Sequence, residues 1–410
     1  MPNPELTILY RGRAVLPMSR PVIEDGGLAV RGSEILSVGK WEDLVRENPG
    51  ATRIDLGEVI LMPGLINAHC HLDYTMMRGA LFGRGPFSAW IQRLNAMRRS
   101  LDQSDYLDAI AMGLRELRHW GCSTVFNIES FPELVPFLPE SSIRVWWFLE
   151  VMDVRSRLHS AEALAGAITF FERAGEGSGG FGISPHAPYT VSKDLYQLAG
   201  LYAQKYRMPL CTHLAESEEE LAMFSKGEGT LHEFLKSIGR PMDDCGGKTP
   251  VEAILGQGLL PPGTLLVHMN HLSVGDRELM TRTAGDYPVI HCPRTHRFFE
   301  RDRFDLEFYQ GAGIPVLLGT DSLASNHDLN MFAEMRVMAS AYPSLDPSEL
   351  LAMVTTRPAA AIRRSGRLGE LSPGALADFI AVPDPMGDAS VMERVLANTL
   401  PPRLWISGQE

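Results

Sequence analysis

The feature that most constrains the fold of this chain is a regular alternation of apolar β runs and amphipathic helical stretches, which begins near Pro63. The helical stretches include YLDAIAMGLRELRHWG and KDLYQLAGLYAQKY. The β runs number eight: VILMPGLINAHCH, CSTVFNIE, IRVWWFLEV, GFGISPH, MPLCTHLAE, TLLVHMNHL, YPVIHCP and IPVLLGTDS. Regular strand–helix alternation predicts an α/β fold with a parallel sheet, and eight repeats predict closure into a (β/α)8 TIM barrel.

Short β patterns flank this repeat at both ends of the chain. The first 60 residues alternate between apolar and polar positions, and LGELSPGALADFIAV and RLWISGQE return to β texture near the end. We therefore expect residues 62–366 to form the barrel, and residues 1–61 and 367–410 to form one small β-sandwich together. Long loops at 72–103 and 217–262 follow the first and fifth barrel strands, where substrate contacts are carried in this fold.

The charge balance argues against two classes of partner. The chain has 50 acidic and 38 basic residues and a net charge of −12, whereas nucleic acids and anionic membrane surfaces attract positive proteins. The sequence has neither a signal-peptide pattern nor an apolar stretch of about 18 residues that could span a membrane. Its five scattered cysteines form no C-x-x-C pair, which fits reduced thiols. We expect a cytoplasmic protein that acts on a small molecule.

Candidate metal ligands stand repeatedly at the ends of the apolar runs. His69 and His71 are two residues apart, so that both imidazoles can share one face of a strand. His213, His268 and Asp321 end three later runs. In a barrel these strand ends converge on one face, where the active site lies. A set of imidazoles and one carboxylate suits zinc, iron or manganese and leaves a position open for water. Histidines with unrelated structural roles would have no reason to stand repeatedly at the same point of the strand–helix repeat, so their position favours a metal site.

The motifs NAHCH, HLAE, HMNHL and GTDS, with the terminal LGELSPGALADFIAV, resemble the amidohydrolase superfamily over essentially the whole chain. The similarity is greatest to the branch that holds adenosine-type, S-adenosylhomocysteine, guanine and aminofutalosine deaminases and triazine chlorohydrolases. It implies a barrel with a small β-sandwich from both termini, and it allows a homodimer. It also implies four metal ligands, which correspond here to His69, His71, His213 and Asp321.

The fourth barrel strand bears on the number of metal ions. Two-metal members of the superfamily usually bridge their ions with a carboxylated lysine on this strand. Here the strand ends in His186, and Lys193 lies in the following helical segment. We therefore expect one divalent metal ion, zinc in the first place, with iron or manganese as alternatives.

The resemblance assigns catalytic roles to three side chains. Glu216, in HLAE, corresponds to the residue that protonates the ring nitrogen of the substrate and passes a proton to the departing ammonia. His268 corresponds to a histidine that orients the attacking water, although His271 could take a structural role beside it. Asp321 can accept a proton from the water as well as bind the metal. Glu216 could instead be a first-turn glutamate that interacts with a helix dipole.

Three further residues are candidates for substrate binding: His186 in SPHAPYT, Trp90 in FSAWIQ and Arg294 in CPRTH. Each has a structural alternative, as a strand-end packing group, a core aromatic or a solvent-facing cation. The CPRTH form, with His296, resembles that of aminofutalosine deaminases of menaquinone biosynthesis, whose substrate carries a benzoate. Arg294 could meet such a carboxylate.

The sequence therefore predicts a metal-dependent hydrolytic deaminase of a 6-aminopurine nucleoside, with 6-amino-6-deoxyfutalosine as the first candidate substrate. S-adenosylhomocysteine, methylthioadenosine and adenosine are close alternatives, and guanine or a chlorotriazine is more distant. A two-metal amidase that cleaves a cyclic amide would be a different mechanistic class. A barrel scaffold without catalysis is disfavoured because the whole ligand constellation is present.

Overall fold

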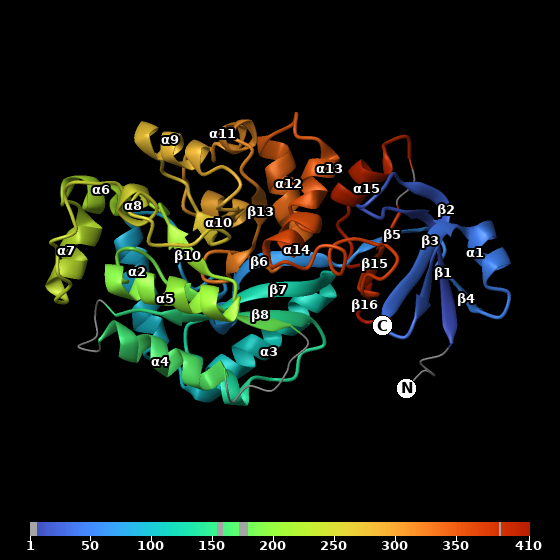
Figure 1. Ribbon diagram of the computed structural model, residues 1–410, viewed down its shortest axis with the longest axis horizontal. Helices are drawn as coiled ribbons and strands as arrows, with labels where there is room; N and C mark the ends of the chain where they lie inside the picture. Colours follow the sequence, from blue (N-terminus) through green and yellow to red (C-terminus); the bar gives the residue numbers. More distant parts are fainter. Residues whose placement is uncertain (1–5, 154–158, 172–178, 385–386) are drawn as a thin grey trace.

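A computed structural model describes residues 6–153, 159–171, 179–384 and 387–410 of the chain (Figure 1). Parallel strands surrounded by helices occupy one part of the molecule. A sheet built from both ends of the chain lies beside them, at the right of Figure 1, where both termini are found.

The parallel strands form a TIM-barrel-type α/β fold. Strand pairing gives a five-stranded sheet in the order β14-β6-β7-β8-β9 and a four-stranded sheet in the order β10-β11-β12-β13. A parallel bridge between Ile183 and Leu210 connects the two sheets at one edge. At the other edge, only two residues separate β13, an edge strand of the four-stranded sheet, from β14, an edge strand of the five-stranded sheet. The bounds are β6 Leu65–His71, β7 Cys122–Glu129, β8 Arg144–Val151, β9 Gly180–Pro185, β10 Cys211–Leu214, β11 Leu265–His268, β12 Val289–His291, β13 Val316–Leu318 and β14 Asp321–Ser322.

These strands are rich in apolar residues and deeply buried, because helices cover their outer side. All eight residues of β7 are buried. The covering helices are amphipathic: α5 (Lys193–Tyr206) begins at Ser192, whose hydroxyl accepts the Leu195 N–H, and buries Leu195 and Tyr196 against the sheet. The remaining helices of the barrel part are α3 Gln103–His119, α4 Ser160–Phe171, α9 Val274–Arg282, α10 Pro293–Phe298, α11 Leu306–Gly311, α12 Met331–Ala341, α13 Pro347–Ala352 and α14 Thr356–Ala361.

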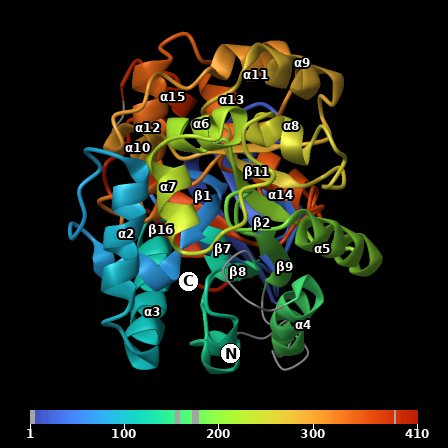
Figure 2. The same ribbon diagram turned by 90° about the vertical axis from the view of Figure 1, so that its left-hand side faces the viewer.

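The two segments predicted to be long loops contain helices of their own. The first holds η1 (Leu72–Met77) and α2 (Phe87–Arg98). The second holds α6 (Glu218–Lys226), α7 (Thr230–Ser237) and α8 (Pro250–Ile254). Figure 2 shows α6 and α7 in front of the strands and α2 to their left. A further short helix, η2 (Pro132–Phe137), follows β7.

Strands from both chain ends meet in one seven-stranded sheet, in the order β16-β15-β5-β1-β2-β3 with β4 beside β1. Tyr10, Phe379 and Trp405 form its aromatic core, in which the last two rings are parallel with centroids 4.7 Å apart. The sandwich form and the domain boundaries at 61/62 and 366/367 stay predictions. The bounds are β1 Thr7–Val15, β2 Ile23–Arg31, β3 Glu34–Lys40, α1 Trp41–Glu47, β4 Thr52–Asp55, β5 Val59–Pro63, β15 Phe379–Pro383, α15 Val391–Leu396 and β16 Arg403–Trp405.

The run VILMPGLINAHCH is not one strand, so this part of the prediction is wrong. It divides at Gly64: β5 pairs with β15 in the terminal sheet, whereas β6 belongs to the parallel strands. A side chain at Gly64 would come within 2.5 Å of Ser123, so the chain passes between the two sheets where only glycine fits.

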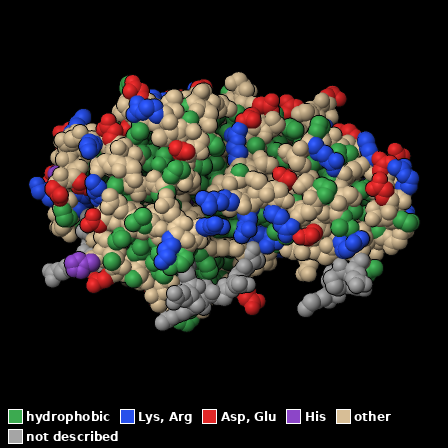
Figure 3. All heavy atoms as spheres, viewed as in Figure 1, with side chains coloured by type: hydrophobic (Ala, Val, Ile, Leu, Met, Phe, Trp, Pro, Cys, Tyr) green, Lys and Arg blue, Asp and Glu red, His purple; other side chains and the backbone are tan. Residues whose placement is uncertain are grey.

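The surface carries charges of both signs. In the view of Figure 3, acidic and basic side chains are interspersed, and Lys and Arg side chains gather near the middle of the face. Among the helices in the described ranges, none has the length and apolar character needed to cross a membrane.

Candidate active site

The five residues predicted at strand ends come together at the carboxyl edge of the parallel strands. β6 supplies His69 and His71, β10 supplies His213, β11 supplies His268 and β14 supplies Asp321. All five side chains are buried. His268 and Asp321 have left-handed backbone conformations, with φ of 76° and 56°. Such conformations are costly for residues with a side chain and are typical of functional sites.

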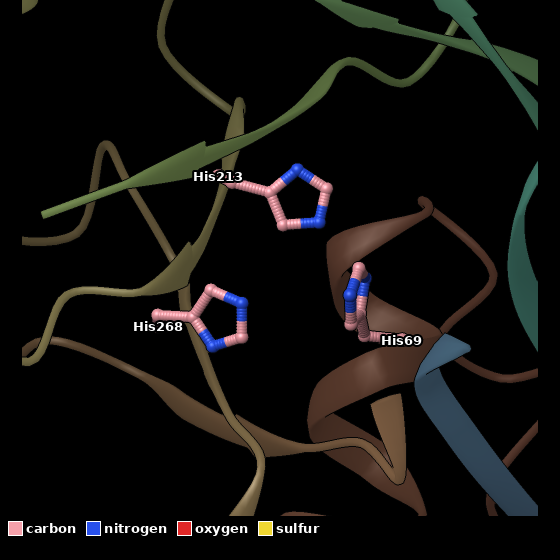
Figure 4. Close-up of side chains that lie close together, drawn as sticks. All are labelled: His69, His213 and His268. Atoms are coloured by element: carbon pink, nitrogen blue, oxygen red, sulfur yellow. The ribbon is translucent and has the colours of Figure 1, made fainter. Parts of the chain in front are cut away.

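The spacing of the polar atoms fits a single bound cation. Asp321 Oδ1 lies 3.7 Å from His69 Nε2 and 3.9 Å from His71 Nε2, and the Nε2 atoms of His71 and His213 are 3.4 Å apart. Ligand atoms placed tetrahedrally at about 2.1 Å from zinc would be about 3.4 Å apart. Figure 4 shows His69, His213 and His268 facing one another from separate elements.

Unpartnered nitrogen atoms also indicate a cation. Both ring nitrogens of His69 and Nδ1 of His71 are buried without a hydrogen-bond partner among the described residues. His213 is oriented through Nδ1, which donates to the His186 carbonyl oxygen over 3.0 Å. This hydrogen bond leaves the lone pair of His213 Nε2 directed at the centre of the cluster, as in metal-binding histidines.

Burial sets the electrostatics of the cluster. It lowers the pKa of His69, His71 and His268 well below the usual value, and it also lowers the pKa of His213. These imidazoles are therefore neutral near pH 7, which is the form that binds metal. Burial, together with repulsion from Glu216, raises the pKa of Asp321 to about 7. A bound cation would favour its ionised form.

Glu216 lies directly beside this cluster. Its Oε1 is 3.8 Å from His268 Nε2, and His268 Nε2 is in turn 4.0 Å from Asp321 Oδ2. Arg301 Nη2 donates to the same Oε1 over 3.0 Å. The three side chains predicted to be catalytic are thus within reach of one small substrate group.

Four residues of the cluster, His71, His213, His268 and Asp321, line a cavity of about 280 Å³, near the lower end of the size range of small-molecule sites, about 300 Å³. The walls are largely aromatic and aliphatic, and they come mainly from α2, which follows the first parallel strand, and from α7, which follows the fifth. Trp90 and Phe87 of α2 stack at 5.9 Å, and both contact Phe299 edge-on. The other apolar lining residues are Tyr74, Ile91, Leu94, Met152, Tyr189, Leu231, Phe234 and Leu235.

Two of the three predicted substrate-binding residues line this cavity. Trp90 is buried in the wall, and its Nε1 has no hydrogen-bond partner among the described residues. His186 follows β9 and is partly exposed; its Nδ1 contacts Thr190 Oγ1 at 2.5 Å. Burial lowers the pKa of His186 to about 3, so its ring is neutral.

Arg294 is placed differently from the expectation, because it is not among the residues that line the cavity. Its guanidinium is engaged by the carboxylate of Asp328, and its backbone N–H donates to Glu334. His296 is likewise held elsewhere, since its two ring nitrogens contact Asn270 Oδ1 and the Asp302 carbonyl oxygen. The Arg294 guanidinium is thus already paired with a carboxylate of the protein itself.

Three charged residues of the site were not predicted. Arg301 follows α10, and no periodicity marks it as inward-facing. Glu150 ends a buried strand, and this position at a strand terminus was a signal that could have identified it. Its Oε1 is buried without a hydrogen bond among the described residues. Arg98, at the end of α2, also lines the cavity, and its guanidinium lies 4.8 Å from the Phe131 ring centroid.

Comparison with known proteins decides the family. The amidohydrolase family matches residues 60–400 of the chain. The chain belongs to the amidohydrolase family. Its members typically bind a metal, in agreement with the buried histidine and aspartate cluster. The chain is a hydrolase of the group that acts on C–N bonds in cyclic amidines.

The similar members of this family include deaminases. An aminodeoxyfutalosine deaminase of Deinococcus radiodurans is 33% identical over 341 residues, which cover 80% of this chain and 78% of the relative. A 5-methylthioadenosine/S-adenosylhomocysteine deaminase of Nitratidesulfovibrio vulgaris is 28% identical, and the aligned residues cover 93% of this chain and 84% of the relative. A crystal structure of an adenosine deaminase from Xanthomonas campestris with bound zinc has a TM-score of 0.82 at 22% identity, and the aligned parts cover 99% of this chain and 93% of that protein. This structural similarity shows that the two proteins share a fold.

Proposed function

We propose that this amidohydrolase is a one-metal hydrolytic deaminase of 6-aminopurine nucleosides, with 6-amino-6-deoxyfutalosine of menaquinone biosynthesis as its preferred substrate. The main support for the proposal is that Glu216, His268 and Asp321 lie close together, beside His69, His71 and His213. A deaminase needs a nucleophilic water, a base for it and an acid for the ring nitrogen, and these three side chains can supply the proton transfers.

His69, His71, His213 and Asp321 would hold the metal ion, for which we propose zinc. When bound, a divalent metal lowers the pKa of a coordinated water, to about 7 for zinc, so that hydroxide is available at neutral pH. Support for a single ion comes from the lining of the cavity, which contains no lysine among the described residues. Lys193 is the first residue of α5 and does not line the cavity.

The protein's own side chains then carry the protons. Asp321 accepts a proton from the attacking water, and neutral His268 orients that water through a hydrogen bond. Glu216 protonates the ring nitrogen next to the carbon under attack, so that negative charge does not accumulate on the ring. The ionised Glu216 then takes the hydroxyl proton of the tetrahedral adduct and passes it to the amino group, so that the C–N bond breaks, the carbonyl forms and ammonia leaves. The proton held by Asp321 returns to Glu216 and restores both side chains for the next turnover.

The walls of the cavity suit a flat heterocycle with a polar substituent. Trp90 and Phe299, which contact each other edge-on, can pack together against a purine and exclude water from the reacting carbon. His186 is proposed to contact the substrate beyond the purine. Glu150 and Arg98 add a negative and a positive side chain to the same wall.

The choice of 6-amino-6-deoxyfutalosine rests on the relative from Deinococcus radiodurans. It has no support from Arg294, whose side chain pairs with Asp328. Deamination of methylthioadenosine, S-adenosylhomocysteine or adenosine is the second candidate, favoured by the relative from Nitratidesulfovibrio vulgaris. A cytoplasmic location and a homodimer complete the proposal, the former supported by the five cysteines, all of which are free thiols.

Ammonia release from a panel of amines by the purified zinc-loaded protein tests the proposal. The panel contains 6-amino-6-deoxyfutalosine, methylthioadenosine, S-adenosylhomocysteine, adenosine and guanine, with chloride release from a chlorotriazine measured in parallel. We expect the highest kcat/KM for 6-amino-6-deoxyfutalosine. A higher value for methylthioadenosine or S-adenosylhomocysteine would change the assigned substrate, and activity on guanine or the chlorotriazine alone would refute nucleoside deamination.

A further inference from the structure

We propose that Arg301 is a positioning residue that orients the Glu216 carboxylate for proton transfer. This inference rests on the proposed function and adds to it a residue that the ligand and proton-transfer sets do not contain. The starting observation is the ion pair between Arg301 Nη2 and Glu216 Oε1, which are 3.0 Å apart. The two side chains are only 7% and 8% exposed. In such surroundings a carboxylate needs a partner, and a charge-assisted hydrogen bond has a well-defined direction.

The backbone of Glu216 is already fixed by two other side chains. Its N–H donates to Glu220 Oε2 over 2.7 Å, and its carbonyl oxygen accepts from Asn270 Nδ2 over 3.0 Å. These contacts come from α6 and from the segment after β11. The remaining freedom of Glu216 is therefore rotation of its own side chain, which has several rotamers of similar energy. Arg301 selects among them by binding one carboxylate oxygen.

Binding of Oε1 leaves the other oxygen of Glu216 for the substrate. No hydrogen bond to Oε2 is present among the described residues, and Glu216 lines the cavity. An acid that must reach one ring nitrogen gains from such an arrangement, because displacement of a reacting group by about 1 Å can cost about 10²-fold in rate.

Arg301 is itself held by the wall of the cavity. α10 ends at Phe298, and Glu300 takes a left-handed conformation with φ of 52°, which turns the chain so that Arg301 faces inward. Its guanidinium lies 4.6 Å from the ring centroid of Phe299 and 5.7 Å from that of Phe87. Both rings line the cavity, so the layer against which a purine would pack also supports the residue that orients the acid.

Three variants test the role of Arg301. R301Q removes the charge, R301K keeps the charge without the planar donor pair, and R303Q is the matched control. Arg303 lies two residues further along, is 55% exposed and pairs with Glu307 instead. For each zinc-loaded variant, kcat and KM are measured with the best 6-aminopurine nucleoside, together with zinc content and the thermal unfolding midpoint.

We expect R301Q to lower kcat about 10²-fold with KM changed less than about threefold, as for loss of positioning. R301K should have a kcat about tenfold higher than that of R301Q, because an ammonium can still bind Oε1 as a point charge. R303Q should match the wild type, and zinc content should be the same throughout. Retained kcat in R301Q, or a rise in KM with unchanged kcat, would overturn the proposal. If R301Q does not fold, R301K decides: a folded R301K with wild-type kcat and KM shows that no directed donor is needed and likewise overturns it.

A crystal structure of R301Q separates this inference from the proposed function. We expect the Glu216 carboxylate to leave its wild-type rotamer while the positions of His213 and Asp321 are unchanged. An unmoved carboxylate would overturn the positioning role. If the wild type releases no ammonia from any nucleoside, the proposed function fails, and the two crystal structures still decide whether Arg301 orients Glu216.

Discussion

Replacement of Glu216 by Gln probes the proton transfers that distinguish a deaminase from a site that only binds metal. The amide has the same shape as the carboxylate, and its oxygen can still accept from Arg301, which lies 3.0 Å from Oε1. It cannot carry a proton to the ring nitrogen. General acid–base catalysis contributes about 10²–10⁴-fold, so we expect E216Q to lower kcat about 10³-fold, or about 4 kcal/mol in the activation barrier.

The structure also predicts what E216Q leaves unchanged. Glu216 is 3.8 Å from His268 and is not in the proposed ligand set, so zinc content should stay at the wild-type value. The buried Arg301 charge loses its counter-ion, which should lower the free energy of unfolding by about 1–3 kcal/mol. Ammonia release, metal analysis and denaturant unfolding measure the three effects. E218Q is the control, because Glu218 is exposed on the same segment. Turnover within tenfold of the wild type, with metal retained, would refute the proton-transfer role of Glu216.

Three further predictions concern the metal, pH and stability. H71A removes one of four proposed ligands, so the purified variant should contain less than half an equivalent of zinc and show no measurable turnover; full zinc content would contradict the ligand assignment. Burial raises the pKa of Glu334 to about 8 from a usual value of 4.5, so its contribution to stability is present below about pH 4.5 and is lost as the pH rises through 8. Denaturant unfolding between pH 5 and 8 should therefore show a steeper loss of stability in the wild type than in E334Q, by at most about 1.4 kcal/mol per pH unit, and parallel curves would argue against this. Asp378 accepts two hydrogen bonds from buried Arg144, of 2.6 and 3.2 Å, so D378N should lower the free energy of unfolding by about 3–5 kcal/mol, whereas a loss below about 1 kcal/mol would show that the pair is not needed.

The strand-end positions of the site could be predicted because the register of a parallel sheet constrains them. A histidine two residues after another on a buried strand must point to the same side, as His69 and His71 do. Asp321 pairs with Cys70, the residue between them, so its place beside both histidines follows from strand order. Those parts of the site depend on local periodicity and on fold topology, both of which are visible in the sequence.

The residues after β12 could not be placed in this way. Arg294 and Arg301 both follow the seventh strand of the predicted barrel, and nothing in their sequence context says which one pairs with Glu216. The outcome depends on the left-handed conformation of Glu300 and on the aromatic layer of Phe87 and Phe299, which come from distant segments. Likewise, the division of the first apolar run at Gly64 depends on a close approach to Ser123 that is made only in the folded chain.

The central claim is a deaminase site that works with one metal ion held by His69, His71, His213 and Asp321. Zinc titration of the metal-free protein, with ammonia release from a 6-aminopurine nucleoside measured at each step, tests it most directly. The proposed site predicts that activity rises in proportion to added zinc and levels off at one equivalent per chain. Activity that levels off only at two equivalents, or that is present in the metal-free protein, would contradict it.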